Sequence, residues 1–315
     1  MSPSFTYRIT KYDPADRDED GRYIGVEETV SDHGPVEAAY LSSIAAFAAA
    51  SGMDRLEIRE PSVTGVVHFG LEPPVEGHGL GAIFPPDLAG YYDGAEVPLP
   101  VALELVRTML RDQGAWCRLE AGEVFTVHVG WDQYVYVGTD RLCADAVAHT
   151  RELGLFPEPV AISPYAAELQ EPDVLEAADE GFWVRVRAAL ASRKGVLLEE
   201  GYVRNAARFH RVTPENLDAV RTGLAPRALL TVWPDLNPDV NEVLATLPEG
   251  STEFVWQAQD GAIRHAAVDD TEYQELAALV AGARAASALP AYPDECHPLL
   301  RAALPDSDGV LRARW

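Results

Sequence analysis

The sequence predicts an α+β fold in two domains, each with helices packed on short, largely antiparallel sheets. A chain of 315 residues is long enough for about two domains of ordinary size. Segments with helical spacing of apolar residues are interleaved with short strand-like segments, and several neighbouring strands are separated by only two or three turn residues. Such hairpin connections favour antiparallel pairing over a doubly wound parallel sheet.

The composition and the positions of proline and glycine suggest where the domains divide. We expect an N-terminal α+β domain over 1–165, a linker over 166–180, a C-terminal α+β domain over 181–290 and a tail over 291–315. The linker region is rich in Pro, Ala and acidic residues and has weak periodicity. Within the first domain, residues 70–94 hold six glycines and four prolines, and loops of that length without secondary structure are often functional.

The N-terminal domain opens with an alternating strand at 5–12. A helix follows, with Pro35 at its first position, one apolar stripe, and Gly52 as its stop signal. Local alternation and turn residues then define the rest of this domain. Its remaining expected elements are a strand at 55–59, a helix from Pro100 to Gly114, strands at 116–120, 124–129 and 134–137, and a helix capped by Asp140 that ends at Gly154.

The C-terminal domain contains the strongest turn signal of the chain. Asp260 and Gly261 join two strand-like segments, 252–258 and 262–267, as the central pair of a hairpin turn. The other expected elements are a helix at 182–192, a strand at 196–199, a helix at 214–223 capped by Thr213, a strand at 228–233, a short helix at 240–247, and a long helix capped by Asp270 that runs to about Ser287.

The charge excludes some classes of function. Fifty acidic residues against 25 basic ones give a net charge of -25, and Lys11 and Lys194 are the only lysines. Such a field repels polyanions at long range, which disfavours proteins that coat nucleic acids or anionic membranes. The N-terminus has no secretory pattern, no window approaches a membrane span, and the three cysteines form no close pair. We therefore expect a cytoplasmic protein with reduced thiols.

One acidic loop matches a calcium-binding pattern. Asp16, Asp18, Asp20 and Glu27 stand at the spacing of D-x-[DN]-x-[DN]-G-x5-E, whose hard oxygen ligands surround a cation. That pattern belongs between two helices, whereas here Pro14 and an expected strand precede it. A solvated acidic turn is the alternative interpretation. Ca²⁺ is the one cofactor that the residues suggest, and otherwise none is expected.

A local reversal of charge suggests a binding surface. Basic residues gather over 185–211, interleaved with Phe182, Trp183, Tyr202 and Phe209. Guanidinium groups contact phosphates and aromatic rings stack on unpaired bases, which is the chemistry of single-stranded RNA binding. The alternative is that these arginines pair with the excess acids. The candidate residues for RNA or phosphate are Arg193, Lys194, Arg204, Asn205, Arg208, His210 and Arg211.

Motifs of known enzymes do not occur in the chain. It has no P-loop, no G-x-S-x-G, no H-E-x-x-H and no dinucleotide-binding G-x-G-x-x-G after a strand. Catalytic residues are unknown, and a binding protein is favoured over an enzyme. An enzyme with an unrecognised site would place it at the 70–94 loop, with His33, His68 or His78 nearby.

Several phrases of the N-terminal half resemble a known family. TYRITKYDPADRDEDGRY, SDHGPVEAAYL, HFGLEPP, GAWCRLE and VHVGWDQYVYVG are similar to uncharacterised actinobacterial proteins commonly labelled "RNA-binding protein", over most of residues 5–165. The resemblance implies an RNA partner and supplies no site residues. The global charge supports a different partner, a basic protein that this acidic chain masks, as an immunity-type protein does. Neither interpretation involves a membrane.

Overall fold

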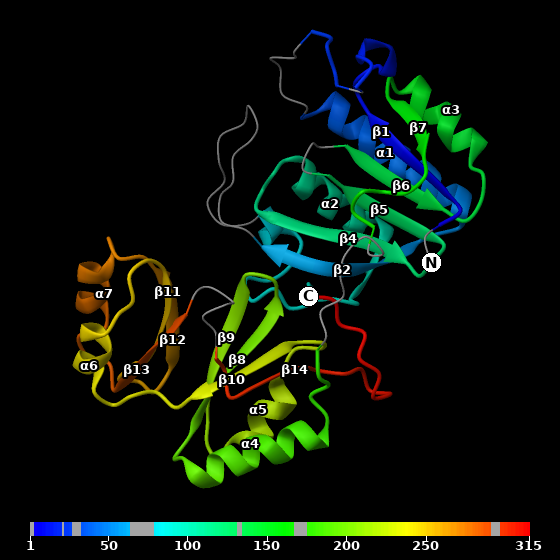
Figure 1. Ribbon diagram of the computed structural model, residues 1–315. Coiled ribbons are helices and arrows are strands. Elements are labelled where there is room, and N and C mark those ends of the chain that lie inside the picture. Colours follow the sequence, from blue (N-terminus) through cyan, green and yellow to red (C-terminus); the bar gives the residue numbers. More distant parts are fainter. Residues whose placement is uncertain are drawn as a thin grey trace. The chain divides into compact units, whose positions relative to one another are not determined.

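The computed structural model describes residues 3–20, 22–26, 33–63, 79–130, 134–166, 175–290 and 297–315 (Figure 1). The chain divides into two compact units. The first consists of Met1–Asp173 with Val203–Asn205 and Arg314–Trp315, and the second of Val174–Tyr202 with Ala206–Ala313. Both contain helices and antiparallel sheets, so the predicted α+β class is confirmed.

The first unit is built on a seven-stranded antiparallel sheet in the order β3-β2-β4-β5-β6-β1-β7. Its helices pack against the sheet and one another. The strands are β1 (Phe5–Thr10), β2 (Arg55–Val63), β3 (Glu96–Pro98), β4 (Ala115–Ala121), β5 (Phe125–Val129), β6 (Val135–Thr139) and β7 (Phe156–Val160). The helices are α1 (Pro35–Ser51), α2 (Leu99–Leu110) and α3 (Ala144–Glu152), with short 3-10 turns η1 (Pro14–Asp16) and η2 (Gly79–Ala82).

Helix α1 has the boundaries that its sequence predicts. Pro35 occupies the first turn, and Gly52 at φ 74° ends the helix, where its N–H bonds to the carbonyl of Ala49. Phe47 of this helix lies 5.2 Å from the ring of Tyr7 on β1, and both side chains are buried. The apolar stripe of α1 is therefore seated on the sheet.

The second unit combines two antiparallel sheets. One has the order β14-β10-β8-β9 and the other β12-β11-β13. Their strands are β8 (Val196–Val203), β9 (Ala206–Val212), β10 (Leu229–Pro234), β11 (Thr252–Gln257), β12 (Ile263–Val268), β13 (Ala285–Pro290) and β14 (Leu300–Ala303). The helices are α4 (Glu180–Ser192), α5 (Leu217–Gly223), α6 (Val240–Ala245) and α7 (Tyr273–Leu279).

Both faces of the four-stranded sheet are covered. Asp179 caps α4 by accepting the N–H of Phe182, and the helix buries Phe182, Trp183 and Leu190 against one face. On the other face, Leu197 and Trp233 belong to a second apolar cluster together with residues of β11 and β13. The second unit thus has a helix layer and a small three-stranded lobe on opposite sides of one sheet.

Three sequence expectations are wrong in detail. Helix α3 begins at Ala144 after Cys143, so Asp140 is not its cap. Thr213 does not cap the next predicted helix, because its N–H bonds to Asn216 Oδ1 in a turn and α5 begins only at Leu217. The predicted long helix after Asp270 is the short α7 followed by strand β13, because pairing with β11 overrides the helical preference of this alanine-rich segment.

Some elements were not predicted from the sequence at all. Strand β7 contains Pro157 and Pro159, which normally argue against a strand, but it lies at the edge of the sheet, where a missing N–H is tolerated. Strand β9 lies within the arginine-rich segment.

Among the described residues, no helix has the length and apolar character that crossing a membrane requires.

Candidate functional site

The two faces of the first unit's sheet differ in chemistry. Ile58, Leu119, Val127, Val137 and Tyr7 are cross-strand neighbours in one continuous row. Because Tyr7 packs on Phe47 of α1, this row faces the helices. Successive residues of a strand point to opposite faces, so the neighbouring residues of the same strands lie on the other face, away from the helices.

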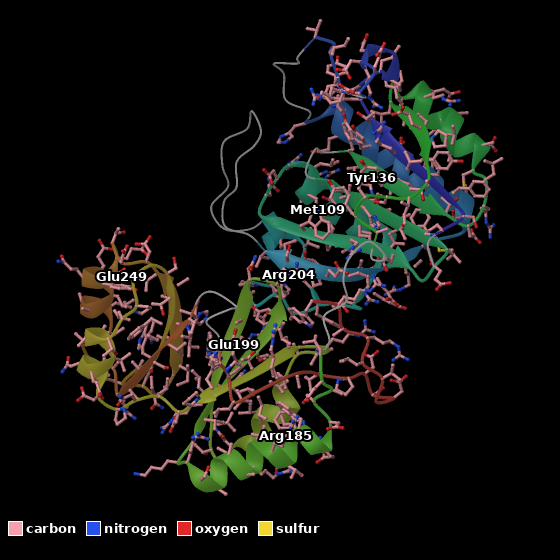
Figure 2. The ribbon with its side chains drawn as sticks, in the orientation of Figure 1. Met109, Tyr136, Arg185, Glu199, Arg204 and Glu249 are labelled. Carbon is pink, nitrogen blue, oxygen red and sulfur yellow. The ribbon has the colours of Figure 1, made fainter. Side chains whose placement is uncertain are left out.

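The face away from the helices carries two polar rows. In the first, Glu57 lies opposite Glu120, Glu120 opposite Thr126, Thr126 opposite Gly138, and Gly138 opposite Thr6. The second row lies two residues further along each strand than the first. In it, Arg59 lies opposite Arg118, and Tyr136, labelled in Figure 2, lies opposite both His128 and Arg8. Like charges directly opposite each other are unfavourable unless a counter-charge sits beside them.

A pocket of about 210 Å³ lies over the first row, and we call it the carboxylate pocket. Thr126, which lines the pocket, lies so close to Gly138 that a Cβ at Gly138 would approach Thr126 Oγ1 to 2.5 Å. The pocket is lined by Pro3, Thr6, Glu57, Arg59, Glu120, Gly122, Glu123, Thr126, His128, Ile162, Ser163, Ala166 and Arg314.

A β-bulge shapes one side of this site. The register of β2 against β4 shifts between Arg59 and Ser62, and Glu60 adopts φ 50°, a left-handed conformation that non-glycine residues rarely take. The carboxylate of Asp93 holds this geometry, since Oδ1 accepts the N–H of Glu60 at 2.9 Å and Nε of Arg59 at 3.0 Å. Asp93 is only 1% exposed. Strained backbone held by buried charges is typical of functional sites.

The second row is anchored beneath the surface. Arg118 is fully buried, its guanidinium pairs with Glu60, and Nη1 donates to the Tyr165 carbonyl at 2.7 Å. Burial lowers the pKa of Arg118 to about 10, while the charge of Glu120 acts in the opposite direction, so this group stays protonated at neutral pH. His128 Nδ1 lies 2.8 Å from Ser163 Oγ, and both residues are buried.

The guanidinium group of Arg314 binds the carboxylate of Glu120. Nη1 of Arg314 donates to Oε1 at 3.0 Å and to Oε2 at 3.1 Å. Arg314 belongs to the first unit, lies outside any helix or strand, and its side chain is 36% exposed. Arg59 lies beside the other carboxylate, with Nη1 3.4 Å from Glu57 Oε2. The two opposed carboxylates therefore each have a guanidinium partner.

The basic residues predicted for RNA binding are placed in and around the hairpin of β8 and β9. Arg204 and Asn205 form its turn and are grouped with the first unit, with Asn205 at φ 64°. In the second unit, Arg208 Nη1 lies 3.8 Å from Glu200 and its guanidinium lies 4.1 Å from the Tyr202 ring centroid. Arg193 and Lys194 are exposed after α4.

Acidic neighbours neutralise much of this segment. His210 Nε2 lies 2.7 Å from Glu200 Oε2, and Arg211 donates from Nε and Nη2 to both oxygens of Asp235 at 2.8 Å. The hydrogen bonds to Asp235 raise the pKa of Arg211. These contacts favour the alternative in which the arginines balance the excess of acids, since Arg208, His210 and Arg211 each lie beside a carboxylate.

The other predicted sites lie partly outside the described residues. Of the calcium candidates, Asp16, Asp18 and Asp20 are described, and Asp18 Oδ1 accepts the N–H groups of Asp20 and Arg22 in a turn. Glu27 lies outside, as do His68 and His78 of the enzyme hypothesis. Within the described part of the chain no cluster of three potential metal ligands occurs. The calcium site stays a prediction.

Comparison with known proteins supplies no family. No protein-family model, no curated protein and no solved structure matches the chain. The sequence motifs do not predict the carboxylate pocket, although part of the pattern that forms it is visible in the sequence. The segments RLEIRE and WCRLE alternate charged with apolar residues, which predicts strands with one charged face but not that the charges are buried.

Proposed function

We propose that this chain is a binding protein whose first unit takes a cationic ligand with a guanidinium group in the carboxylate pocket. The observation that carries the proposal is the guanidinium of Arg314 on both oxygens of Glu120. The Arg314 guanidinium lies where the guanidinium group of a ligand would bind. The ligand is either a small guanidine compound or an arginine side chain of a basic partner protein, and the two sources share this chemistry.

The charges around the pocket support a cation. Glu57, Glu120 and Glu123 line it, against Arg59 and the tail residue Arg314. When Arg314 is displaced, a ligand cation beside Glu120 supplies the counter-charge that two carboxylates facing each other across neighbouring strands require. The net charge of -25 also attracts cations at long range and speeds their association.

The exposure of Arg314 supports exchange with an external ligand. At 36% exposure the side chain is not part of the core, and it comes from a segment without regular secondary structure. A charge-assisted hydrogen bond contributes about 1.5–3 kcal/mol. Because of the exposure we use the lower end for each of the two bonds, about 3 kcal/mol in total, so a guanidinium compound without other contacts should bind with a Kd on the order of 10 mM.

Calorimetric titration tests the proposal in an Arg314→Ala protein, which leaves Glu120 open. Methylguanidine should bind, whereas methylurea, its neutral analogue of similar shape, should not. Adding Glu120→Gln should abolish the heat, and adding Glu152→Gln, an exposed change on α3, should leave it unchanged. Equal binding of methylguanidine and methylurea, or equal binding by the Glu120→Gln protein, would contradict the proposal.

A tripeptide arm separates the two sources of the ligand. If Gly-Arg-Gly binds the Arg314→Ala protein at least tenfold more tightly than methylguanidine, flanking backbone contributes and the source is a partner protein. Equal affinities indicate a free small molecule. The partner outcome would agree with the expectation that this acidic chain masks a basic protein.

RNA binding is a second candidate, and the Tyr202 ring favours it. Arg208 stacks on this ring at 4.1 Å, and both residues are partly exposed. An aromatic ring beside a guanidinium is a platform on which unpaired bases stack. Fluorescence anisotropy with a single-stranded RNA should show salt-sensitive binding that Tyr202→Ala and Arg193→Ala weaken. Absence of binding at low salt would contradict this candidate.

A further inference from the structure

Strand β13 in the second unit has an edge that is only partly paired. On the side away from β11, Asn237 exchanges two backbone hydrogen bonds with Ala286, at 2.8 and 2.9 Å, in an isolated antiparallel bridge. In an antiparallel strand, alternate residues direct both N–H and C=O to the same edge, so those of Ala288 point to the same side as those of Ala286. In the described part of the chain, pairing along this edge ends at Asn237.

The chain leaves this edge at a proline. Pro238 follows Asn237, and Asp239 then caps α6 by accepting the N–H of Glu242 at 3.1 Å. Segment 235–237 therefore begins to add a fourth strand to the sheet and stops after one residue pair. An edge strand with open N–H and C=O groups is a template for pairing with another chain.

A groove of about 380 Å³ runs beside the open part of the edge. Backbone on one side and apolar side chains on the other are the two elements that strand addition uses, the first for affinity and the second for side-chain pockets. The lining includes Ala286–Pro290 of β13 together with Asn237, Val243, Thr246 and Pro248.

The charge of this lobe indicates the kind of segment that fits. Residues 235–290 contain ten acidic side chains and only two arginines, Arg264 and Arg284. Asp239 and Glu242 start α6 beside the groove, and Glu249, labelled in Figure 2, follows the groove residue Pro248; all three are exposed. A basic segment is complementary to this surround, and an acidic one is repelled.

We propose that this groove binds an extended, basic segment of a partner protein, which pairs with the open edge of β13 as an added strand. The inference is independent of the carboxylate pocket, since the residues of the groove all belong to the second unit. Backbone bonds to Ala288 supply the register, and the acidic surround selects the charge of the partner.

The test uses a basic peptide, acetyl-KVKVKV-amide, and its acidic counterpart, acetyl-EVEVEV-amide. Every protein in the comparison carries Glu120→Gln, so that binding at the carboxylate pocket does not contribute. Ala288→Pro removes the N–H from the open edge, a change that edge strands tolerate. The matched control is Ala267→Pro on β12. Ala267 lies opposite Glu253 of β11 but is not hydrogen-bonded to it, so its N–H points to the exposed outer edge of β12.

We expect the basic peptide to bind, the acidic peptide not to bind, and Ala288→Pro to weaken binding at least tenfold while Ala267→Pro leaves it unchanged. Glu249→Lys, an exposed change that does not alter the strand, should weaken binding about threefold and reduce its salt dependence. Equal affinity of the two proline variants, equal affinity of the two peptides, or no binding of the basic peptide would overturn the proposal.

Discussion

Asp93→Asn should destabilise the strand pair that carries the candidate site. Asp93 is 1% exposed and pairs with Arg59, whose side chain is 9% exposed, at 3.0 Å. Removing one partner of a buried ion pair costs about 3–5 kcal/mol, because the remaining charge is left in a poorly hydrated position. The asparagine Oδ1 still accepts the N–H of Glu60, so we expect the lower end, about 3 kcal/mol.

Hydrogen exchange read by mass spectrometry measures this effect locally, since a chain of two units need not unfold in one step. At 1.36 kcal/mol for each factor of ten, amides of β2 and β4 should exchange roughly 100-fold faster in Asp93→Asn. Glu152→Gln on α3 is the control and should change exchange little. A change of less than about threefold in β2 and β4 would refute the reasoning, because Glu57 alone would then suffice to stabilise Arg59.

Three further predictions concern single residues. Burial raises the pKa of the Cys117 thiol to about 12, so iodoacetamide at pH 8 should label it only after unfolding, and a label located at Cys117 in the native protein would contradict its burial. Burial also raises the pKa of Glu199, whose carboxylate accepts Trp233 Nε1. The folded state then holds this proton more tightly than the unfolded chain, so stability falls as pH rises through the raised pKa. Glu199→Gln should therefore raise the melting temperature of the second unit at pH 8 and not at pH 4, and an equal shift at both would contradict the assignment. Gly261→Ala should cost about 1–2 kcal/mol in urea unfolding, because Gly261 adopts φ 89°, and a cost near zero would show that the turn relaxes.

The parts of the fold that the sequence predicts are those with local signals. Pro35 and Gly52 mark the ends of α1, and Asp260 with Gly261 marks the β11–β12 hairpin, because each acts through its own backbone conformation. The helix predicted after Asp270 runs to about Ser287 and so includes the first half of β13, since its alanines favour a helix locally. Its pairing with β11, about 30 residues earlier, decides its conformation, and no local pattern reports that pairing.

The candidate site was not predictable for the same reason. Glu57 and Glu120 are more than 60 positions apart, and only the register of β2 against β4 brings them opposite each other. Arg314 is 194 positions from Glu120. The sequence does show charged residues alternating with apolar ones in both strands, which predicts a charged face. Burial of that face beside a pocket depends on tertiary contacts such as that of Asp93, which comes from the expected 70–94 loop.

The most direct measurement of the central claim is calorimetric titration of methylguanidine into the wild-type protein and into Arg314→Ala. If Arg314 occupies the ligand position, it competes as a tethered guanidinium, and its removal should tighten binding about tenfold, the equivalent of 1.4 kcal/mol. The account predicts this gain and its loss when Glu120 is also changed to glutamine. Identical titration curves for the wild-type and Arg314→Ala proteins would contradict it.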